Sequence, residues 1–143
     1  MVVLDTNVLV AALWSRKGGS FQIVDRALRG ELQIAVSVAL VLEYEDVLKR
    51  AAMREASWAN IVDLDVILDT LLVHAKLVSP ITVRGRPFLR DANDDMVLEC
   101  ALQARADAIV TMNLRDFALV PGKFGIDIVN PGLFLARMKG YEQ

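Results

Sequence analysis

Acidic side chains supplied by distant segments are the residues of this chain best suited to chemistry. Asp5 ends the apolar run 1–4 and is followed by Thr6 and Asn7. The further acids of this group are Glu43, Asp91, Asp94, Asp95 and Asp116. Carboxylates repel one another unless a cation lies between them, and hard divalent cations prefer oxygen ligands. If the fold gathers these groups, they indicate a divalent metal site, with Mg²⁺ chemistry on phosphates as the leading interpretation.

Apolar runs separated by helical patterns predict the elements that must position these acids. We expect strands at residues 2–4, 32–36, 74–78, 108–111 and 126–129. We expect helices at residues 8–14, 21–28, 37–50, 56–72 and 93–106, and a last helix from Pro131. Strands that alternate with helices favour a parallel sheet covered on both faces. The predicted fold is therefore α/β, a three-layer α/β/α sandwich with a central, mainly parallel sheet of about five strands.

Asp5, Glu43 and Asp94 are expected at one edge of this sheet. Open parallel sheets bind ligands in the crevice beyond the carboxyl ends of their strands, and Asp5 stands at the tip of the first strand. Ser37 is a good N-cap residue, so Glu43 falls one to two turns inside the helix that Ser37 starts. Asp94 lies near the start of a later helix, which leads into another strand. These positions allow one acidic pocket.

The cluster Asp91, Asp94 and Asp95 has two interpretations. Its members are three and four positions apart, which predicts a shared helical face if this turn is helical. Alternatively, they are first-turn residues that the helix dipole favours. The capping interpretation can hold for Asp91 while Asp94 binds metal.

Composition limits the class of protein. At 143 residues the chain fits a single domain, residues 1–143, without an evident linker or repeat. Hydrophobic residues make up 55% of it and the mean hydropathy is +0.40, yet no apolar stretch approaches the roughly 20 residues of a membrane span. We expect the apolar excess in a covered sheet or a subunit interface, with no membrane partner. Asp5 and Asn7 interrupt what would be a signal core, which favours a cytoplasmic protein.

Cations near the acids could guide a phosphate backbone, although the net charge is only -2. The candidate RNA-binding residues are Arg16, Lys17, Arg84, Arg86 and Arg90, and further cations follow Glu43 at Lys49 and Arg50. Ordinary solvated surface charge is the alternative for each. Cys100 is interpreted as a core residue and His74 as a structural or surface residue.

Together these segments resemble the PIN-domain ribonuclease family, especially the small VapC-like toxins of bacterial toxin–antitoxin pairs. The resemblance rests on 4–9 (LDTNVL), Ser37, 42–44 (LEY), 47–48 (VL), 91–95 (DANDD), 106–117 (ADAIVTMNLRDF) and 125–131 (GIDIVNP). Each motif is weak alone, but their order and spacing over nearly the whole length are specific.

The resemblance implies a Mg²⁺- or Mn²⁺-dependent endoribonuclease. The family's first acid corresponds to Asp5, its helical glutamate to Glu43 and its third acid to Asp94, with Asp95 as the competitor. The fourth position, an aspartate in many relatives, is Asn113 here, and Asp116 is the nearby carboxylate. This departure leaves the number of metals open.

The same resemblance suggests a role for each group. Asp5 and Asp94 hold the metal, with Glu43, Asp95 and Asp116 as further possible ligands. Glu43 helps to hold the metal or deprotonates the attacking water, and Asp116 joins the catalytic group. The supporting polar residues are Thr6, Asn7, Ser37, Asp91, Thr111 and Asn113. A toxin of this kind would form a homodimer and bind an antitoxin, whose arginine could reach the carboxylates.

Two alternatives remain open at this stage. A Mg-dependent phosphatase could use Asp5 as its nucleophile, but Asn7 occupies the place where the haloacid-dehalogenase pattern has a second aspartate. A PIN-like RNA- or protein-binding module without catalysis is the other, and Asn113 motivates it.

Overall fold

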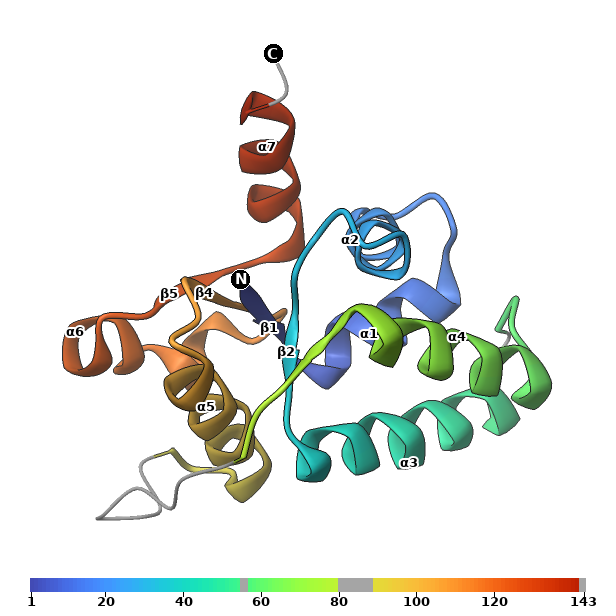
Figure 1. The fold of residues 1–143 in the computed structure, drawn as a ribbon, viewed down its shortest axis with the longest axis horizontal. Helices are drawn as coiled ribbons and strands as arrows, with labels where there is room; N and C mark the ends of the chain where they lie inside the picture. The colour runs from blue at the N-terminus through green and yellow to red at the C-terminus, as the bar shows by residue number, and fades with distance from the viewer. Residues whose placement is uncertain (55–56, 80–88, 142–143) are drawn as a thin grey trace.

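The computed structural model describes residues 1–54, 57–79 and 89–141, and its fold is shown in Figure 1. The candidate cations Arg84 and Arg86 lie outside the described residues. In chain order the elements are β1 (Val2–Leu4), α1 (Thr6–Trp14), α2 (Gly19–Leu28), β2 (Ala35–Val36), α3 (Val38–Arg54), α4 (Ile61–His74), β3 (Lys76–Leu77), α5 (Ala92–Ala104), β4 (Ala108–Val110), the 3-10 helix η1 (Leu114–Phe117), α6 (Val120–Phe124), β5 (Asp127–Val129) and α7 (Pro131–Tyr141).

Every strand pairing in the described structure is parallel. One sheet has the order β1-β4-β5, in which Val3 lies opposite Ile109 and Ile109 opposite Ile128. β2 pairs with β3 in a second, two-stranded sheet, and a single parallel bridge from Val2 to Ile34 links the two sheets beside β1. This arrangement confirms the predicted α/β class with its parallel strands.

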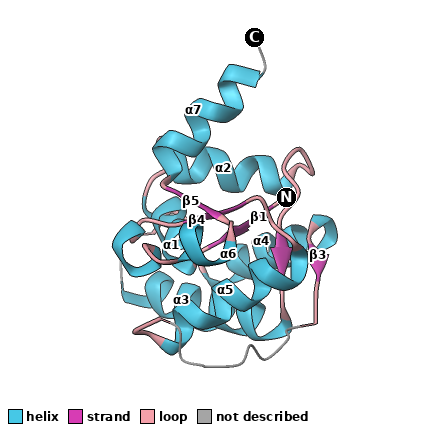
Figure 2. Cartoon of the chain, turned by 90° about the vertical axis from the view of Figure 1, so that its left-hand side faces the viewer, coloured by secondary structure: helices cyan, strands magenta, loops and turns pink. Residues whose placement is uncertain are grey.

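Helices enclose the strands, as the two ribbon views show (Figures 1 and 2). α5 packs against β1, β2 and β4, while α1 contacts α2 and α3. All residues of β1 and β4 are buried. Because both faces of these strands are covered, their sequences are continuous apolar runs rather than alternating patterns. The buried centre fixes the strand tips from which the acidic residues project.

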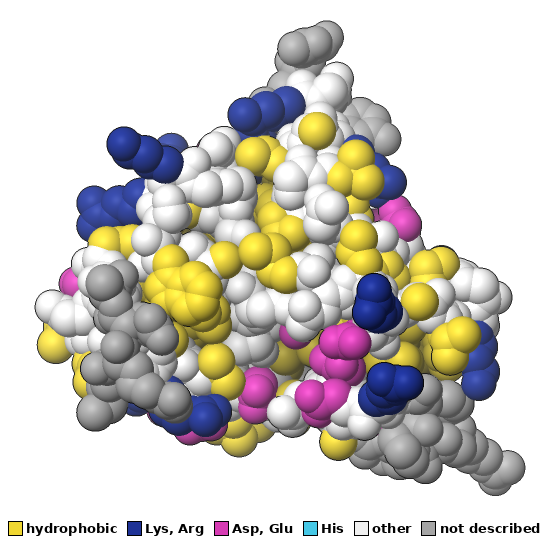
Figure 3. Space-filling view, turned by 180° about the vertical axis from the view of Figure 1, so that it is seen from behind, with side chains coloured by type: hydrophobic (Ala, Val, Ile, Leu, Met, Phe, Trp, Pro, Cys, Tyr) yellow, Lys and Arg dark blue, Asp and Glu magenta, His cyan; other side chains and the backbone are white. Residues whose placement is uncertain are grey.

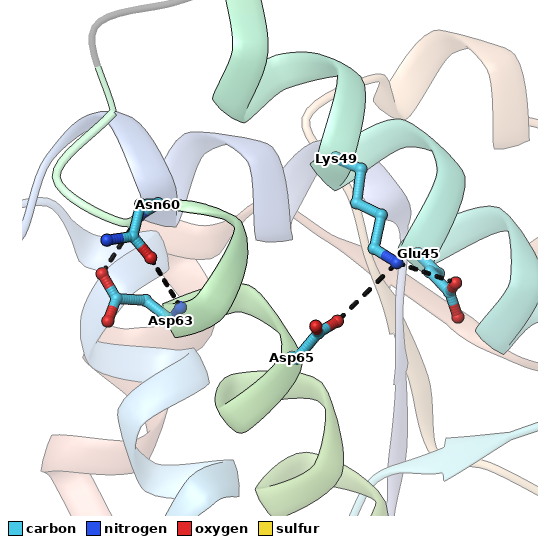
Figure 4. Close-up of polar contacts among 5 residues, drawn as sticks. All are labelled: Glu45, Lys49, Asn60, Asp63 and Asp65. Atoms are coloured by element: carbon cyan, nitrogen blue, oxygen red, sulfur yellow. Dashed lines mark hydrogen bonds and ion pairs between the residues drawn. The ribbon is translucent and has the colours of Figure 1, made fainter.

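The third predicted strand and the helix before it begin later than expected. α4 starts at Ile61, because Asn60 and Asp63 form a capping box in which each side chain accepts from the other's backbone N–H, at 2.9 and 3.0 Å (Figure 4). His74 is the last residue of α4, so β3 is limited to Lys76 and Leu77. The two short helices η1 and α6 were not expected, since four or five residues show no readable periodicity.

Gly30 and His74 fit together closely. Gly30 has φ +75° just past the end of α2, which is the left-handed stop that glycine favours. A Cβ at this glycine would lie 2.9 Å from the Nδ1 atom of His74. This close packing agrees with a structural role for the single histidine.

Lys49 and Arg50, two cations that follow Glu43 on α3, pair with neighbouring acids. Lys49 contacts Glu45 at 3.1 Å and Asp65 of α4 at 3.7 Å (Figure 4), and Arg50 contacts Asp46 at 2.9 Å. Glu45 and Asp46 are exposed, as the helical rotation predicts. The charges of Lys49 and Arg50 are therefore largely balanced. In the described part of the chain, no helix has the length and apolar character needed to cross a bilayer.

Candidate active site

Asp5 is held at the tip of β1 in a buried, hydrogen-bonded position. Its side chain is 7% exposed, and its backbone N–H donates to the Val110 carbonyl at 2.9 Å. Its Oδ1 accepts from the Thr6 N–H at 2.8 Å as the N-cap of α1, and its Oδ2 accepts from the Thr111 hydroxyl at 2.7 Å. One contact therefore comes from α1 and the other from the end of β4, which fixes the carboxylate orientation.

Thr111 and Asn7 connect the tips of β1 and β4. Thr111 is fully buried, and its Oγ1 accepts from the Asn113 N–H at 3.0 Å while it donates to Asp5. The Asn7 Oδ1 accepts from the Met112 N–H at 3.2 Å. These bonds link the start of α1, which follows β1, to the segment that follows the neighbouring parallel strand β4.

Glu43 is carried on α3, whose start is fixed by Ser37. The Ser37 Oγ accepts from the Leu40 N–H at 3.1 Å, which is the bond of an N-cap residue to the third helical position. Ser37 is buried and also hydrogen-bonds to Cys100, so its contribution to the site is to position the helix. Glu43 is half-buried in the second turn of α3.

Tyr44, the residue after Glu43, ties α3 to the strand that carries Asp5. Its side chain is fully buried, and its hydroxyl donates to the Leu4 carbonyl. Burial raises the pKa of Tyr44 well above its usual value, so it stays a neutral donor. No sequence pattern indicates this bond, because a buried tyrosine on a helix face is indistinguishable from any other core aromatic.

We expect Tyr44→Phe to lower the free energy of unfolding by about 1–2 kcal/mol, because the buried Leu4 carbonyl loses a hydrogen bond while packing is kept. Urea denaturation followed by circular dichroism measures this change. If the free energy of unfolding falls with urea concentration at the same slope as in the wild type, the variant unfolds from an equally compact state. A midpoint equal to that of the wild type would contradict this assignment.

Asp91 and Asp94 line the same cleft, whereas Asp95 does not, so the expected shared face of the three acids holds for only two of them. Asp91 is the exposed N-cap of α5, and its Oδ1 accepts from the Asn93 N–H at 2.9 Å. Asp94 is half-buried, whereas Asp95 is 1% exposed and its Oδ1 accepts from the Leu89 N–H at 3.0 Å. Adjacent helical residues differ by about 100° in direction, so Asp95 turns into the protein.

The acids from three helix starts line one cleft of about 270 Å³. Its lining residues are Asp5, Thr6, Asn7, Val10, Glu43, Val47, Asp91, Asn93, Asp94 and Asn113. In the space-filling view from behind, Asp and Glu side chains gather in one patch, with Lys or Arg side chains beside it (Figure 3). The structure thus brings together Asp5, Glu43 and Asp94. Asp95 is not among the residues that line this cleft.

The electrostatics of the cleft are those of crowded carboxylates. Burial first, and then the charges of Asp5, Asp91, Asp116 and Asp95, together raise the pKa of Asp94 to about 7. Burial also raises the pKa of Asp5, opposed by its hydrogen bonds to Thr111 and Thr6. Such carboxylates favour a neighbouring positive charge.

The residues fit a hydrated divalent cation better than a fully protein-bound one. Carboxylate and amide oxygens from Asp5, Glu43, Asp94 and Asn113 are hard donors, as Mg²⁺ and Mn²⁺ require. Within residues 1–54, 57–79 and 89–141, no three acidic, histidine or cysteine side chains are already close enough to hold a metal ion directly. Mg²⁺ takes one or two protein carboxylates and keeps several waters, so contacts through water fit the cleft.

Asn113 and Asp116 lie in different hollows. Asn113 lines the acidic cleft, whereas the exposed Asp116 lines an adjoining hollow of about 260 Å³ together with Arg90 and Arg115. Asp116 still acts on the cleft, because its charge raises the pKa of both Asp5 and Asp94. Arg115 was not singled out in the sequence, although it stands directly beside Asp116.

The remaining predicted residues are placed as follows. Arg16 and Lys17 are exposed beyond the end of α1 and do not line the cleft, and the Arg16 guanidinium lies 4.4 Å from the centre of the Trp58 ring. Burial raises the pKa of the Cys100 thiol to about 12, in keeping with a core residue. Asn93, which lines the cleft, lay within a quoted motif but was given no role.

By its fold and its site, the protein is a parallel α/β protein with a cleft of carboxylates at the tips of its strands. Comparison with known proteins then identifies the family. A family model described as "PIN domain" matches residues 1–115. The chain therefore belongs to the PIN-domain family.

A solved structure supports the same fold. The crystal structure of VapBC2 from Rickettsia felis bound to a DNA fragment from their promoter contains a similar chain, with a TM-score of 0.57 and 17% sequence identity. The match covers 91% of this chain and 98% of that chain. Comparison with curated protein sequences returned no significant match.

Proposed function

We propose that this protein is a Mg²⁺- or Mn²⁺-dependent endoribonuclease that hydrolyses RNA phosphodiester bonds in the cytoplasm. The observation that carries the proposal is the convergence of Asp5, Glu43 and Asp94 from three separate elements on one cleft. Burial, together with the charges of neighbouring aspartates, raises the pKa of Asp5 and of Asp94, and such carboxylates are stabilised by a cation bound beside them. Membership of the PIN-domain family agrees with this chemistry.

The side chains of the cleft have two proposed roles: some bind the metal ion, and one takes part in the reaction of the attacking water. Asp5, fixed by Thr111 and Thr6, and Asp94 on the first turn of α5 are the principal holding groups. A bound divalent cation supplies Lewis-acid polarisation of the phosphate and a lower pKa for water. Glu43, half-buried in the lining of the same cleft, orients the attacking water and accepts its proton.

We expect RNA cleavage to stop when the metal is removed and to return when Mg²⁺ or Mn²⁺ is restored. The measurement is gel-resolved cleavage of several labelled RNAs after dialysis against a chelator, then with each cation added. End mapping is expected to show a 5′-phosphate on the downstream product. Full cleavage in the presence of chelator would contradict the proposal.

Two further substrates distinguish this function from the alternatives. Release of phosphate from a small phosphomonoester, without RNA cleavage, would favour a phosphatase. RNA binding without cleavage under every metal condition would favour a binding module. The structural reason to consider this alternative is that the cleft has the amide of Asn113 at this position.

We also propose that the protein is the toxin of a toxin–antitoxin pair and forms a homodimer. The solved VapBC2 structure with a similar fold is the support for a protein partner. Exposed apolar side chains on α4, at Val62, Val66 and Val73, are the kind of surface that a subunit interface covers. Light scattering of the purified chain measures the dimer, and growth arrest on expression tests the toxin role.

A further inference from the structure

The solvent-facing side of α1 leads from the acidic cleft to an exposed tryptophan. The buried side chains of this helix are Thr6, Val8, Leu9, Ala12 and Leu13. The others, Asn7, Val10, Ala11 and Trp14, have the i, i+3, i+4, i+7 spacing of a single helical face. Asn7 and Val10 line the cleft, so Trp14 continues the same face beyond it.

Trp14 is unusually exposed for its size. Its side chain is 56% accessible, although tryptophans are highly buried on average. From Asn7 to Trp14 the helix rises about 10 Å at 1.5 Å per residue, which equals about three steps of a stacked strand at 3.4 Å each. A strand whose phosphate lies in the cleft therefore reaches Trp14 with a nearby base.

The second wall and the local charge suit a nucleic-acid strand. Val47 stands one turn after Glu43 on α3, and both line the cleft together with Asn7 and Val10 of α1. At the far end of α1, Arg16 and Lys17 follow Trp14 closely and are exposed. The Arg16 guanidinium already lies over the Trp58 ring, so Lys17 is the cation proposed to contact a phosphate here. Cations beside an aromatic surface are the usual combination for binding single strands, because the cations contact phosphates and the ring stacks on a base.

We propose that Trp14 is a stacking platform for a base of single-stranded RNA, within a few nucleotides of the phosphate held in the cleft. The proposal rests on the proposed ribonuclease function and deepens it, because it assigns a single-stranded substrate. Stacking tolerates any base, so Trp14 contributes affinity with little sequence preference. RNA is favoured over a protein partner by the continuity of the Trp14 face with the cleft and by the exposed Lys17 beside it.

The first test combines a protein variant with a substrate variant. An RNA with one mapped cleavage position is prepared with an abasic site at each of the nearest nucleotides in turn. At one of these positions we expect the abasic site to raise the KM of the wild type roughly tenfold and to leave the KM of Trp14→Ala unchanged. Trp14→Phe is expected to restore most of the affinity, and Leu133→Ala on α7 is the matched control for an exposed apolar residue.

The second test needs no cleavage. The chain has two tryptophans, Trp14 and Trp58, and Trp58 is partly buried. In chelator, single-stranded oligouridylate or oligoadenylate is expected to quench part of the wild-type tryptophan fluorescence. Trp14→Ala is expected to lose this quenching, while circular dichroism shows that the variant is folded.

The outcomes separate this proposal from the one on which it rests. Equal KM values for wild type and Trp14→Ala, with no coupling to any abasic site, overturn the stacking proposal and leave the nuclease intact. Quenching that depends on Trp14, in a protein that cuts no RNA with any metal, supports the stacking site and overturns hydrolysis. Quenching of equal size by duplex RNA overturns the single-strand assignment.

Discussion

Asp5→Asn is expected to lower metal-dependent RNA cleavage by about 10³-fold, because several kcal/mol of transition-state stabilisation depend on the cation that this carboxylate helps to hold. The fold is expected to survive the change. The amide oxygen still accepts from the Thr6 N–H, and the Thr111 hydroxyl can accept from the new amide N–H instead of donating. The substitution also replaces a buried carboxylate by a neutral amide. Burial disfavours the charged form of Asp5, as its raised pKa shows.

Single-turnover cleavage of one labelled RNA, at saturating Mg²⁺ and with equal amounts of each protein, measures this loss. Asp69→Asn is the matched control, because it makes the same chemical change on an exposed residue of α4 outside the cleft. Circular dichroism checks that both variants are folded. A folded Asp5→Asn protein that cleaves within a few-fold of the wild-type rate would remove Asp5 from the proposed machinery.

The position of Asp5 and Glu43 follows from rules that act along the sequence. A buried parallel strand is a continuous apolar run, and its end marks the edge where ligands bind. Ser37 then identifies the start of α3, which sets Glu43 in its second turn. The parallel α/β fold was predictable for the same reason.

The choice between Asp94 and Asp95 depends on contacts that the sequence does not contain. Both are good first-turn residues, and they are adjacent in the chain. The Leu89 N–H, supplied by the segment before α5, captures the Asp95 carboxylate and buries it. Asp94 is thereby the member of the pair that faces the cleft.

Contacts between distant segments explain the other differences. Tyr44 reaches the Leu4 carbonyl across 40 residues, and Arg16 stacks on Trp58 across a similar separation. No periodic pattern predicts such pairs, because periodicity describes only which face of an element is buried. The helices η1 and α6 are short enough that their few turns are set by the packing of Phe117 and Val120 into the core.

Asp94→Asn is expected to stabilise the metal-free protein at pH 8 while removing most of the stabilisation by Mg²⁺. The pKa of Asp94 is raised from 3.8 to about 7 in the folded state. The folded protein therefore binds a proton more tightly than the unfolded chain, so the wild type loses stability as the pH rises from about 4 to 7. Asparagine stays neutral and lacks this loss.

The difference in the free energy of unfolding between Asp94→Asn and the wild type, both without metal, is thus expected to be near zero at pH 4 and largest above pH 7. It is about 1 kcal/mol once screening by solvent around this partly exposed carboxylate is taken into account. Thermal unfolding in chelator, measured from pH 4 to 8, gives the metal-free part.

The same unfolding measurement with added Mg²⁺ gives the cation-dependent part. A ligand at 100 times its Kd stabilises the folded state by about 2.7 kcal/mol. We expect a shift of this kind in the wild type at pH 8 and in Asp69→Asn, and a much smaller one in Asp94→Asn. Equal shifts in all three proteins would mean that Asp94 does not hold the cation. A metal-free Asp94→Asn variant less stable than the wild type at pH 8 would mean that the charge of Asp94 does not destabilise the folded protein. The same buried, crowded carboxylates destabilise the metal-free protein and attract the cation. The Asp94→Asn substitution is therefore expected to reduce both the destabilisation at pH 8 and the stabilisation by Mg²⁺.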